Sequence, residues 1–183
     1  MSLGYWWDLF ESCDQYSEAN LRIMEDRFET NSTQLTPLYS IGTTARMLSI
    51  SVQTLRHYER EGLILPYKSD SNQRWYSKSD VERLQCIRNA INDQKLSIEG
   101  IKHIHALIPC WQIRGCSDSD RAKCEAFKGH MQGCWSYNHA NNACSSRDCR
   151  LCEVYRIALN CEEIKKSIIQ FTSNAQAVIE QRS

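Results

Sequence analysis

The sequence predicts a mainly α-helical protein with one small β-wing, a cysteine-rich insert and a long C-terminal helix. Three observations lead to this fold class. Two short helical patterns meet at a tight turn near residue 50, a short extended stretch follows them, and a heptad repeat occupies the C-terminal end. Apolar residues make up 42% of the chain and charged residues 24%, a composition typical of folded globular proteins and not of disordered ones.

Four segments differ in character: an amphipathic extension (1–37), a helical segment with the wing (38–108), a cysteine-rich segment (109–152) and the heptad segment (153–183). The net charge of the whole chain is zero, but acidic and basic residues are unevenly distributed among these segments. The extension holds seven acids and two bases, whereas residues 38–109 hold ten bases and seven acids, a net +3. This positive balance is compatible with nucleic-acid binding but too small to indicate it alone.

The first helical pair is predicted from residue 41 to residue 62. Apolar residues at helical spacing indicate a short helix over 41–48, and Ser51 is a suitable N-cap for a second helix over 52–61. Gly62 supplies the left-handed residue that commonly ends a helix. These features describe a helix-turn-helix, although an ordinary helical hairpin has the same periodicity.

The elements that follow favour a winged helix-turn-helix. Residues 63–77 are polar in the middle and hydrophobic at the ends, as a small β-wing would be. A capping box at Ser79–Glu82 predicts the start of a third helix, and Ser97 predicts the start of a fourth that continues to Ile108.

The motifs of this stretch resemble the DNA-binding domain of the MerR family of transcription regulators nearly end to end. They run as S-x-x-T-L-R-x-Y-E, E-G-L-I-x-P, R-x-Y-S, D-V-x-R-L and L-S-I-E-x-I, without a gap over about seventy residues. The resemblance implies a dimer that reads a palindrome in double-stranded promoter DNA and distorts it for RNA polymerase. It also implies a cytoplasmic location, and we find no apolar run that could span a membrane and no secretory signal.

The second helix of the pair carries the predicted DNA-reading residues. Side chains that donate hydrogen bonds to base edges and phosphates are needed at its exposed N-terminal end. Ser51, Gln53, Thr54 and Arg56 meet that need. The resemblance implies phosphate contacts by Arg56, His57 and Tyr58, although Tyr58 also fits the core. Tyr39, Lys68 and Arg74 are the flanking and wing residues predicted to contact DNA.

The C-terminal segment contains the most regular periodicity of the chain. Apolar residues recur at alternating steps of three and four, the seam of a coiled coil. The seam residues are Val154, Ile157, Cys161, Ile164, Ile168, Phe171, Ala175 and Val178. We predict a homodimeric coiled coil, with packing inside one chain as the alternative.

Cysteines are concentrated between the two helical regions. The seven residues are Cys110, Cys116, Cys124, Cys134, Cys144, Cys149 and Cys152. An odd number of thiols in a chain without a secretory signal argues against a disulfide framework and favours metal binding or redox chemistry. The two Cys-Trp pairs resemble the two-CW cysteine-rich modules fused to signalling proteins.

A bound zinc ion or iron–sulfur cluster is our first prediction for this segment, ahead of reversible thiol switching and structural disulfides. Cys149-x-x-Cys152 has the spacing that both centres use, and His130 and His139 are spare ligands. The two tryptophans, Trp111 and Trp135, are expected to form a small core beneath the centre.

Two other functions stay open from the residues alone. Cys149-x-x-Cys152 could serve a thiol-disulfide oxidoreductase, but that motif usually follows a strand in an α/β unit, which is not predicted here. A DNA-binding protein with a purely structural cysteine module is the second. We expect a regulator and not an enzyme, and we assign no catalytic residue.

Overall fold

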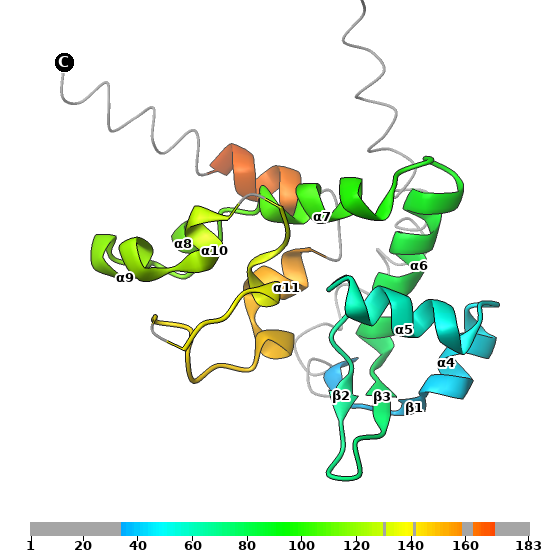
Figure 1. Cartoon of the computed structure of the whole chain (residues 1–183). Coiled ribbons are helices and arrows are strands. Elements are labelled where there is room, and N and C mark those ends of the chain that lie inside the picture. Colours follow the sequence, from blue (N-terminus) through cyan, green and yellow to red (C-terminus); the bar gives the residue numbers. More distant parts are fainter. Residues whose placement is uncertain (1–33, 130, 141, 159–162, 171–183) are drawn as a thin grey trace, which may run out of the picture. The chain divides into compact units, whose positions relative to one another are not determined.

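The computed structural model describes residues 34–129, 131–140, 142–158 and 163–170 (Figure 1). Most of the predicted N-terminal extension and four seam residues (Cys161, Phe171, Ala175 and Val178) lie outside the described residues. The chain divides into two compact units, Met1–Leu96 and Ser97–Ser183. The division falls inside the segment 38–108, so the fourth predicted helix is grouped with the cysteine-rich segment. None of the described helices is long and apolar enough to cross a membrane.

The first unit contains the predicted helix-turn-helix. Helix α4 spans Ile41–Met47 and α5 spans Val52–Arg60, each starting at a serine N-cap. Leu48 and Leu55 are almost fully buried between them. Gly62 has a φ of 72°, and the amide of Leu63 bonds to the carbonyl of Tyr58 at 2.9 Å, which closes the end of α5 as expected.

Three short strands form the wing. β1 (Tyr39–Ser40), β2 (Tyr67–Lys68) and β3 (Arg74–Tyr76) make an antiparallel sheet in the order β1-β3-β2. Because β3 is central, its residues pair on both edges: Trp75 lies opposite Ser40 on one side and Tyr67 on the other. The β2–β3 hairpin is therefore attached to β1, the strand that precedes α4.

Helix α6 (Lys78–Asn92) completes the described part of this unit, but its cap differs from the prediction. Ser77, not Ser79, is the N-cap, and its hydroxyl accepts from the amide of Asp80 at 3.1 Å. The Asp80 carboxylate accepts in return from the amide of Ser77 at 2.8 Å. The reciprocal bonds need a carboxylate three residues after the serine, and the pair Ser77–Asp80 supplies it.

The second unit is built mostly from short elements. Its longest named helix is α7 (Ile98–Ala106), capped by Ser97 as predicted. The cysteine-rich segment follows as α8 (Cys110–Ile113), α9 (Asp118–Lys123), α10 (Glu125–Lys128) and the 3₁₀ turns η2 (Cys134–Ser136) and η3 (Cys149–Leu151). Helices of four to six residues are not stable in isolation, so these turns depend on packing.

The heptad segment is not one continuous helix in the described residues. Helix α11 (Glu153–Ile157) ends where Ala158 turns with a ψ of −3°, and residues 163–170 are helical again. Two predicted seam residues, Val154 and Ile164, are 1% and 5% exposed in the single chain. Packing inside the chain, the alternative left open by the sequence, therefore accounts for these two residues.

Candidate nucleic-acid interface and thiol cavity

The exposed face of α5 presents part of the predicted DNA-reading set. The Ser51 hydroxyl accepts from the amide of Thr54 at 3.0 Å and so caps the helix, and it shares a hydrogen bond with the Thr54 hydroxyl at 2.9 Å. Gln53 and Arg56 are exposed one turn apart. The capped N-terminus therefore fixes the start of the helix, while Gln53 and Arg56 project from it.

The residues that follow Arg56 divide between surface and core. The His57 ring is half-exposed and lies 3.8 Å from the Glu61 carboxylate. Tyr58 is only 6% exposed, and burial raises the pKa of its hydroxyl. Tyr58 is thus chiefly a packing residue, in agreement with its helical spacing from Leu55 on the apolar face.

Glu59 joins the wing to α5, a role that the sequence pattern did not reveal. Its carboxylate pairs with Lys68 at 3.0 Å and with the Arg74 guanidinium, one base from each strand of the hairpin. Burial raises the pKa of Glu59, but the hydrogen bonds from Arg74 and Lys68 outweigh it, so the pKa lies below its usual value. The two wing bases predicted to contact DNA are therefore held in place by a carboxylate.

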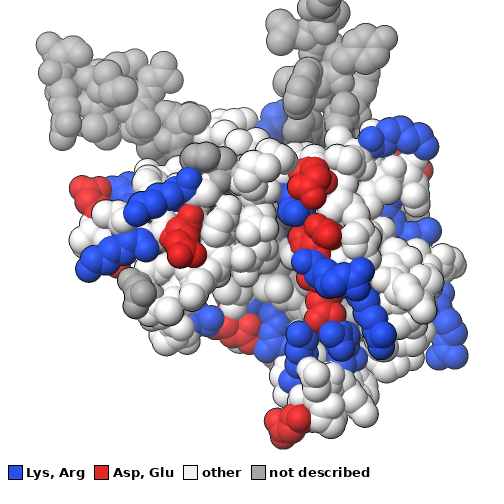
Figure 2. All heavy atoms as spheres, in the orientation of Figure 1, with Lys and Arg blue, Asp and Glu red and all other residues white. Residues whose placement is uncertain are grey.

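A shallow depression lies where the start of α4, the side of α5 and the wing meet. It is lined by Ser40, Ile41, Arg56, Asn72, Gln73, Arg74 and Trp75. Figure 2 shows Lys and Arg side chains gathered over the base of the hairpin. The depression thus brings two predicted residues, Arg56 and Arg74, beside polar groups of the wing tip that the sequence did not single out.

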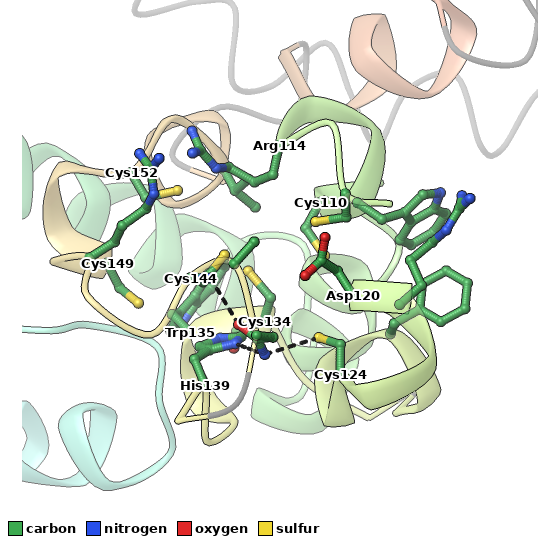
Figure 3. A pocket seen from close by; sticks show the side chains of 18 of the residues that line it. Cys110, Arg114, Asp120, Cys124, Cys134, Trp135, His139, Cys144, Cys149 and Cys152 are labelled. Atoms are coloured by element: carbon green, nitrogen blue, oxygen red, sulfur yellow. Dashed lines mark hydrogen bonds between the residues drawn. The ribbon is translucent and has the colours of Figure 1, made fainter. Parts of the chain in front are cut away.

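In the second unit, all seven cysteines of the cysteine-rich segment line one cavity (Figure 3). Its volume is about 40 Å³, more than the roughly 10–15 Å³ that one water molecule needs. Trp111, Trp135, Arg114 and Asp120 also line it. The segment therefore brings together thiols that are far apart in the sequence. Cys86, which lies in α6, is not among them.

The thiols influence one another electrostatically. A hydrogen bond with Cys134 lowers the pKa of Cys110, and the same contact raises the pKa of Cys134. Burial raises the pKa of Cys116 and Cys144, and repulsion from neighbouring cysteines adds to both. The Arg114 guanidinium acts in the opposite direction on Cys144. One thiolate is thus favoured at Cys110, while the cavity disfavours the accumulation of uncompensated negative charge.

His139 forms hydrogen bonds with two other residues that line the cavity. Its Nε2 lies 2.8 Å from the carbonyl oxygen of Cys134, and its Nδ1 lies 3.0 Å from the side-chain amide of Asn142. The same amide donates to the sulfur of Cys124 at 3.5 Å. Both ring nitrogens are therefore engaged, which argues against the predicted use of His139 as a spare ligand.

Aromatic packing connects the cavity to α7. Trp135, which follows Cys134, is 7% exposed, and its ring centroid lies 5.2 Å from that of His105 in α7 and 5.1 Å from that of Tyr155 in α11. A Cβ atom at Gly133 would collide with the indole ring, so glycine permits this close approach. Trp111 packs edge-on against Phe127 at 5.2 Å and lines the same cavity as Trp135.

The described thiols and acids do not form a ready single-ion site. Among the described residues, no group of three His, Cys, Asp or Glu side chains is placed to hold one metal ion. The eight cysteines in the described ranges are all free thiols. The seven sulfurs surround a space instead of converging on one point, as Figure 3 shows for those that it labels.

Comparison with known proteins agrees with the geometry of the first unit. Residues 39–107 match the model of the MerR HTH family regulatory proteins. The chain is 36% identical over 74 residues to the HTH-type transcriptional regulator TnrA of Bacillus subtilis, which is 40% of this chain and 67% of TnrA. The chain belongs to the MerR family. Its cysteine-rich segment begins after the residues that the MerR model matches.

Other MerR relatives match over a similar stretch. The regulator GlnR of Bacillus anthracis is 34% identical over 68 residues, covering 37% of this chain and 52% of GlnR. Heavy metal-dependent transcription regulator 2 of Rhizobium meliloti is 35% identical over 82 residues, covering 44% of this chain and 53% of its own length. The chain spans about half the length of the first curated relatives that it matches.

The ion pairs of Glu59 predict a pH-dependent difference in stability. Because the folded-state pKa of Glu59 is lowered, its stabilisation is complete above the usual value of about 4.5 and is lost as the pH falls through the lower folded-state pKa. We expect Glu59→Gln to reduce the free energy of unfolding by about 1 kcal/mol at pH 7. The difference from the wild type should shrink in acid. Urea unfolding at pH 7 and pH 3.5 measures it, and an equal loss at both pH values would contradict the role of the charge.

Proposed function

We propose that this MerR protein is a homodimeric transcription regulator that binds palindromic promoter DNA in the cytoplasm. Helix α5 enters the major groove and the wing contacts the flanking backbone. The observation that supports this most directly is the exposed Arg56 beside wing bases that Glu59 holds next to α5. Lys68 is half-exposed despite its ion pair, so its ammonium group can reach a phosphate. Gln53 is suited to reading a base edge.

The dimer is proposed to distort the promoter so that RNA polymerase can use it. MerR-type regulation exchanges deformation energy in the DNA for protein contacts on both half-sites. Such an arrangement needs two DNA readers held at a defined angle. A change in the second unit that altered this angle would change transcription without altering the residues that touch DNA.

The cysteine-rich segment is proposed to receive the signal as a metal or redox change. Helix α7 supports this assignment because it belongs to the range matched by the MerR model and also packs His105 on Trp135. Trp135 and Cys134 both line the thiol cavity. A rearrangement of the thiols would therefore be transmitted to α7 through contacts within the second unit.

A selection from a random duplex library tests DNA recognition. We expect the full-length protein to enrich an inverted repeat, with two half-sites related by the symmetry of the dimer. Arg56→Ala should weaken binding to the enriched duplex about tenfold and lower the salt slope by about 0.9 for each phosphate that the side chain neutralises in the wild type. Lys128→Ala, which removes one exposed charge from the second unit, is the matched control and should change neither value. Failure to enrich any sequence would contradict the proposal.

Dimerisation is proposed to use the seam from Ile168 onward, since Val154 and Ile164 are buried inside the chain. Ile168 is partly exposed, and the heptad spacing continues beyond it to Val178. A charged residue at Ile168 should face its own copy across the seam and separate the subunits.

We therefore expect Ile168→Asp to convert a dimer into a monomer in sedimentation experiments at micromolar concentration. Ile169→Asp is the control, because Ile169 is 53% exposed and lies off the seam. Circular dichroism of both variants checks that the fold is retained. A wild-type protein that sediments as a monomer would refute the coiled-coil dimer.

A further inference from the structure

We propose that the cavity ringed by the seven thiols holds a cluster of two or more thiophilic metal ions, and not a single ion. The proposal deepens the sensing role given above to the cysteine-rich segment. It rests on how many sulfurs share the cavity, how they are spaced and which other groups surround them.

The first observation is that thiols from different parts of the cysteine-rich segment share one cavity. The seven sulfurs come from the start of α8, the loop before α9, the end of α9, η2, the loop that follows it, and both ends of η3. Every one of these cysteines lines the same cavity. Structural thiols that only filled space would pack against apolar side chains, whereas these are neighbours of one another. Thiolates in this number are the ligands that zinc and iron–sulfur centres prefer.

The second observation concerns the distances between the sulfur atoms. Four thiolates around one tetrahedral zinc ion, each at about 2.3 Å, would lie about 3.8 Å apart. No three candidate ligands among the described residues are gathered in that way. A cluster whose iron ions are bridged by inorganic sulfide has its cysteine ligands on the outside, so it suits sulfurs that surround a space. Zinc ions bridged by cysteine sulfurs would require these side chains to move closer together.

The third observation concerns charge and the number of ligands. One tetrahedral ion takes four ligands, which would leave three of the seven thiols without a metal. A divalent ion also neutralises only two thiolates. Several ions would use more of the thiols and balance more of the charge, and the Arg114 and Arg147 side chains that line the cavity would balance part of the rest.

Loading such a site needs no oxidant when zinc is the metal, or when iron is supplied as both Fe²⁺ and Fe³⁺. Each thiol that becomes a ligand releases its proton to the solvent as a metal–sulfur bond forms, and no electron is transferred. Two sources of metal satisfy the same chemistry. Zinc ions could be bridged by cysteine sulfurs, or iron ions could be bridged by inorganic sulfide.

Metal stoichiometry of the full-length protein tests the proposal. Protein purified without oxygen is stripped with chelator and reductant and the reductant is removed. It is then titrated with Zn²⁺ in one arm and with equimolar Fe²⁺ and Fe³⁺ plus sulfide in the other. Bound metal per chain is measured after gel filtration. We expect saturation at two or more ions per chain in at least one arm. Saturation at one ion, or no binding in either arm, would overturn the proposal.

Variants locate the site. Cys134→Ser should lower the bound metal per chain, because Cys134 contacts Cys110 and lines the cavity. Cys86→Ser is the matched control and should leave the stoichiometry unchanged, since Cys86 lies in α6 outside the cavity.

Alkylation of the wild-type protein keeps the test decisive if Cys134→Ser does not fold. The loaded protein should protect Cys110 or Cys134 together with Cys149 or Cys152 in the same molecule, as intact and peptide masses would show. Protection confined to Cys149 and Cys152 would overturn the shared cluster. Binding to the selected duplex is measured on the same samples, so a protein that binds DNA but no metal refutes this proposal alone.

Discussion

The second unit depends on the burial of Trp135 between His105 and Tyr155. Apart from α7 and the helical residues 163–170, its elements are helices of four to six residues and 3₁₀ turns, which have too few internal hydrogen bonds to persist alone. The indole ring gives these turns a common core, and Gly133 permits its close approach. Because Cys134 precedes Trp135, the same packing also fixes a thiol at the cavity. The core and the thiol cavity are thus parts of one arrangement.

In the proposed mechanism, this arrangement connects the thiol cavity to α7 within the second unit. Helix α7 contributes His105 to the aromatic stack and lies within the residues shared with the MerR family. In the first unit, Glu59 plays a comparable part by fixing the wing bases to α5. Both units therefore position functional groups through one central residue, an indole in one case and a carboxylate in the other.

Local signals allowed much of the first unit to be predicted from sequence. The serine cap of α5 and the left-handed Gly62 depend on a few neighbouring residues and could therefore be predicted, and the same holds for the cap of α7 in the second unit. The cap of α6 was misplaced because Ser77 and Ser79 both precede an acid by three residues. The role of Glu59 was missed because its partners, Lys68 and Arg74, lie on the wing, and no local sequence pattern indicates ion pairs between residues so far apart in the chain.

The second unit was harder to predict for a related reason. Seven clustered cysteines indicated metal chemistry, but their gathering around one cavity depends on contacts such as His139 with Asn142, which spacing does not reveal. The heptad repeat likewise could not separate a dimer seam from internal packing, since both require the same apolar stripe. Val154 and Ile164 are buried in the single chain, which favours internal packing for these two residues.

The most direct test of the account is amide hydrogen exchange in α7 of the full-length protein, compared between metal-loaded and metal-free samples. If the thiol cavity is coupled to α7 through Trp135, loading should slow exchange across Ile98–Ala106 as well as in the cysteine-rich segment. If exchange slows in the cysteine-rich segment while α7 stays unchanged, the proposed route from the cavity to the DNA-binding domain is wrong.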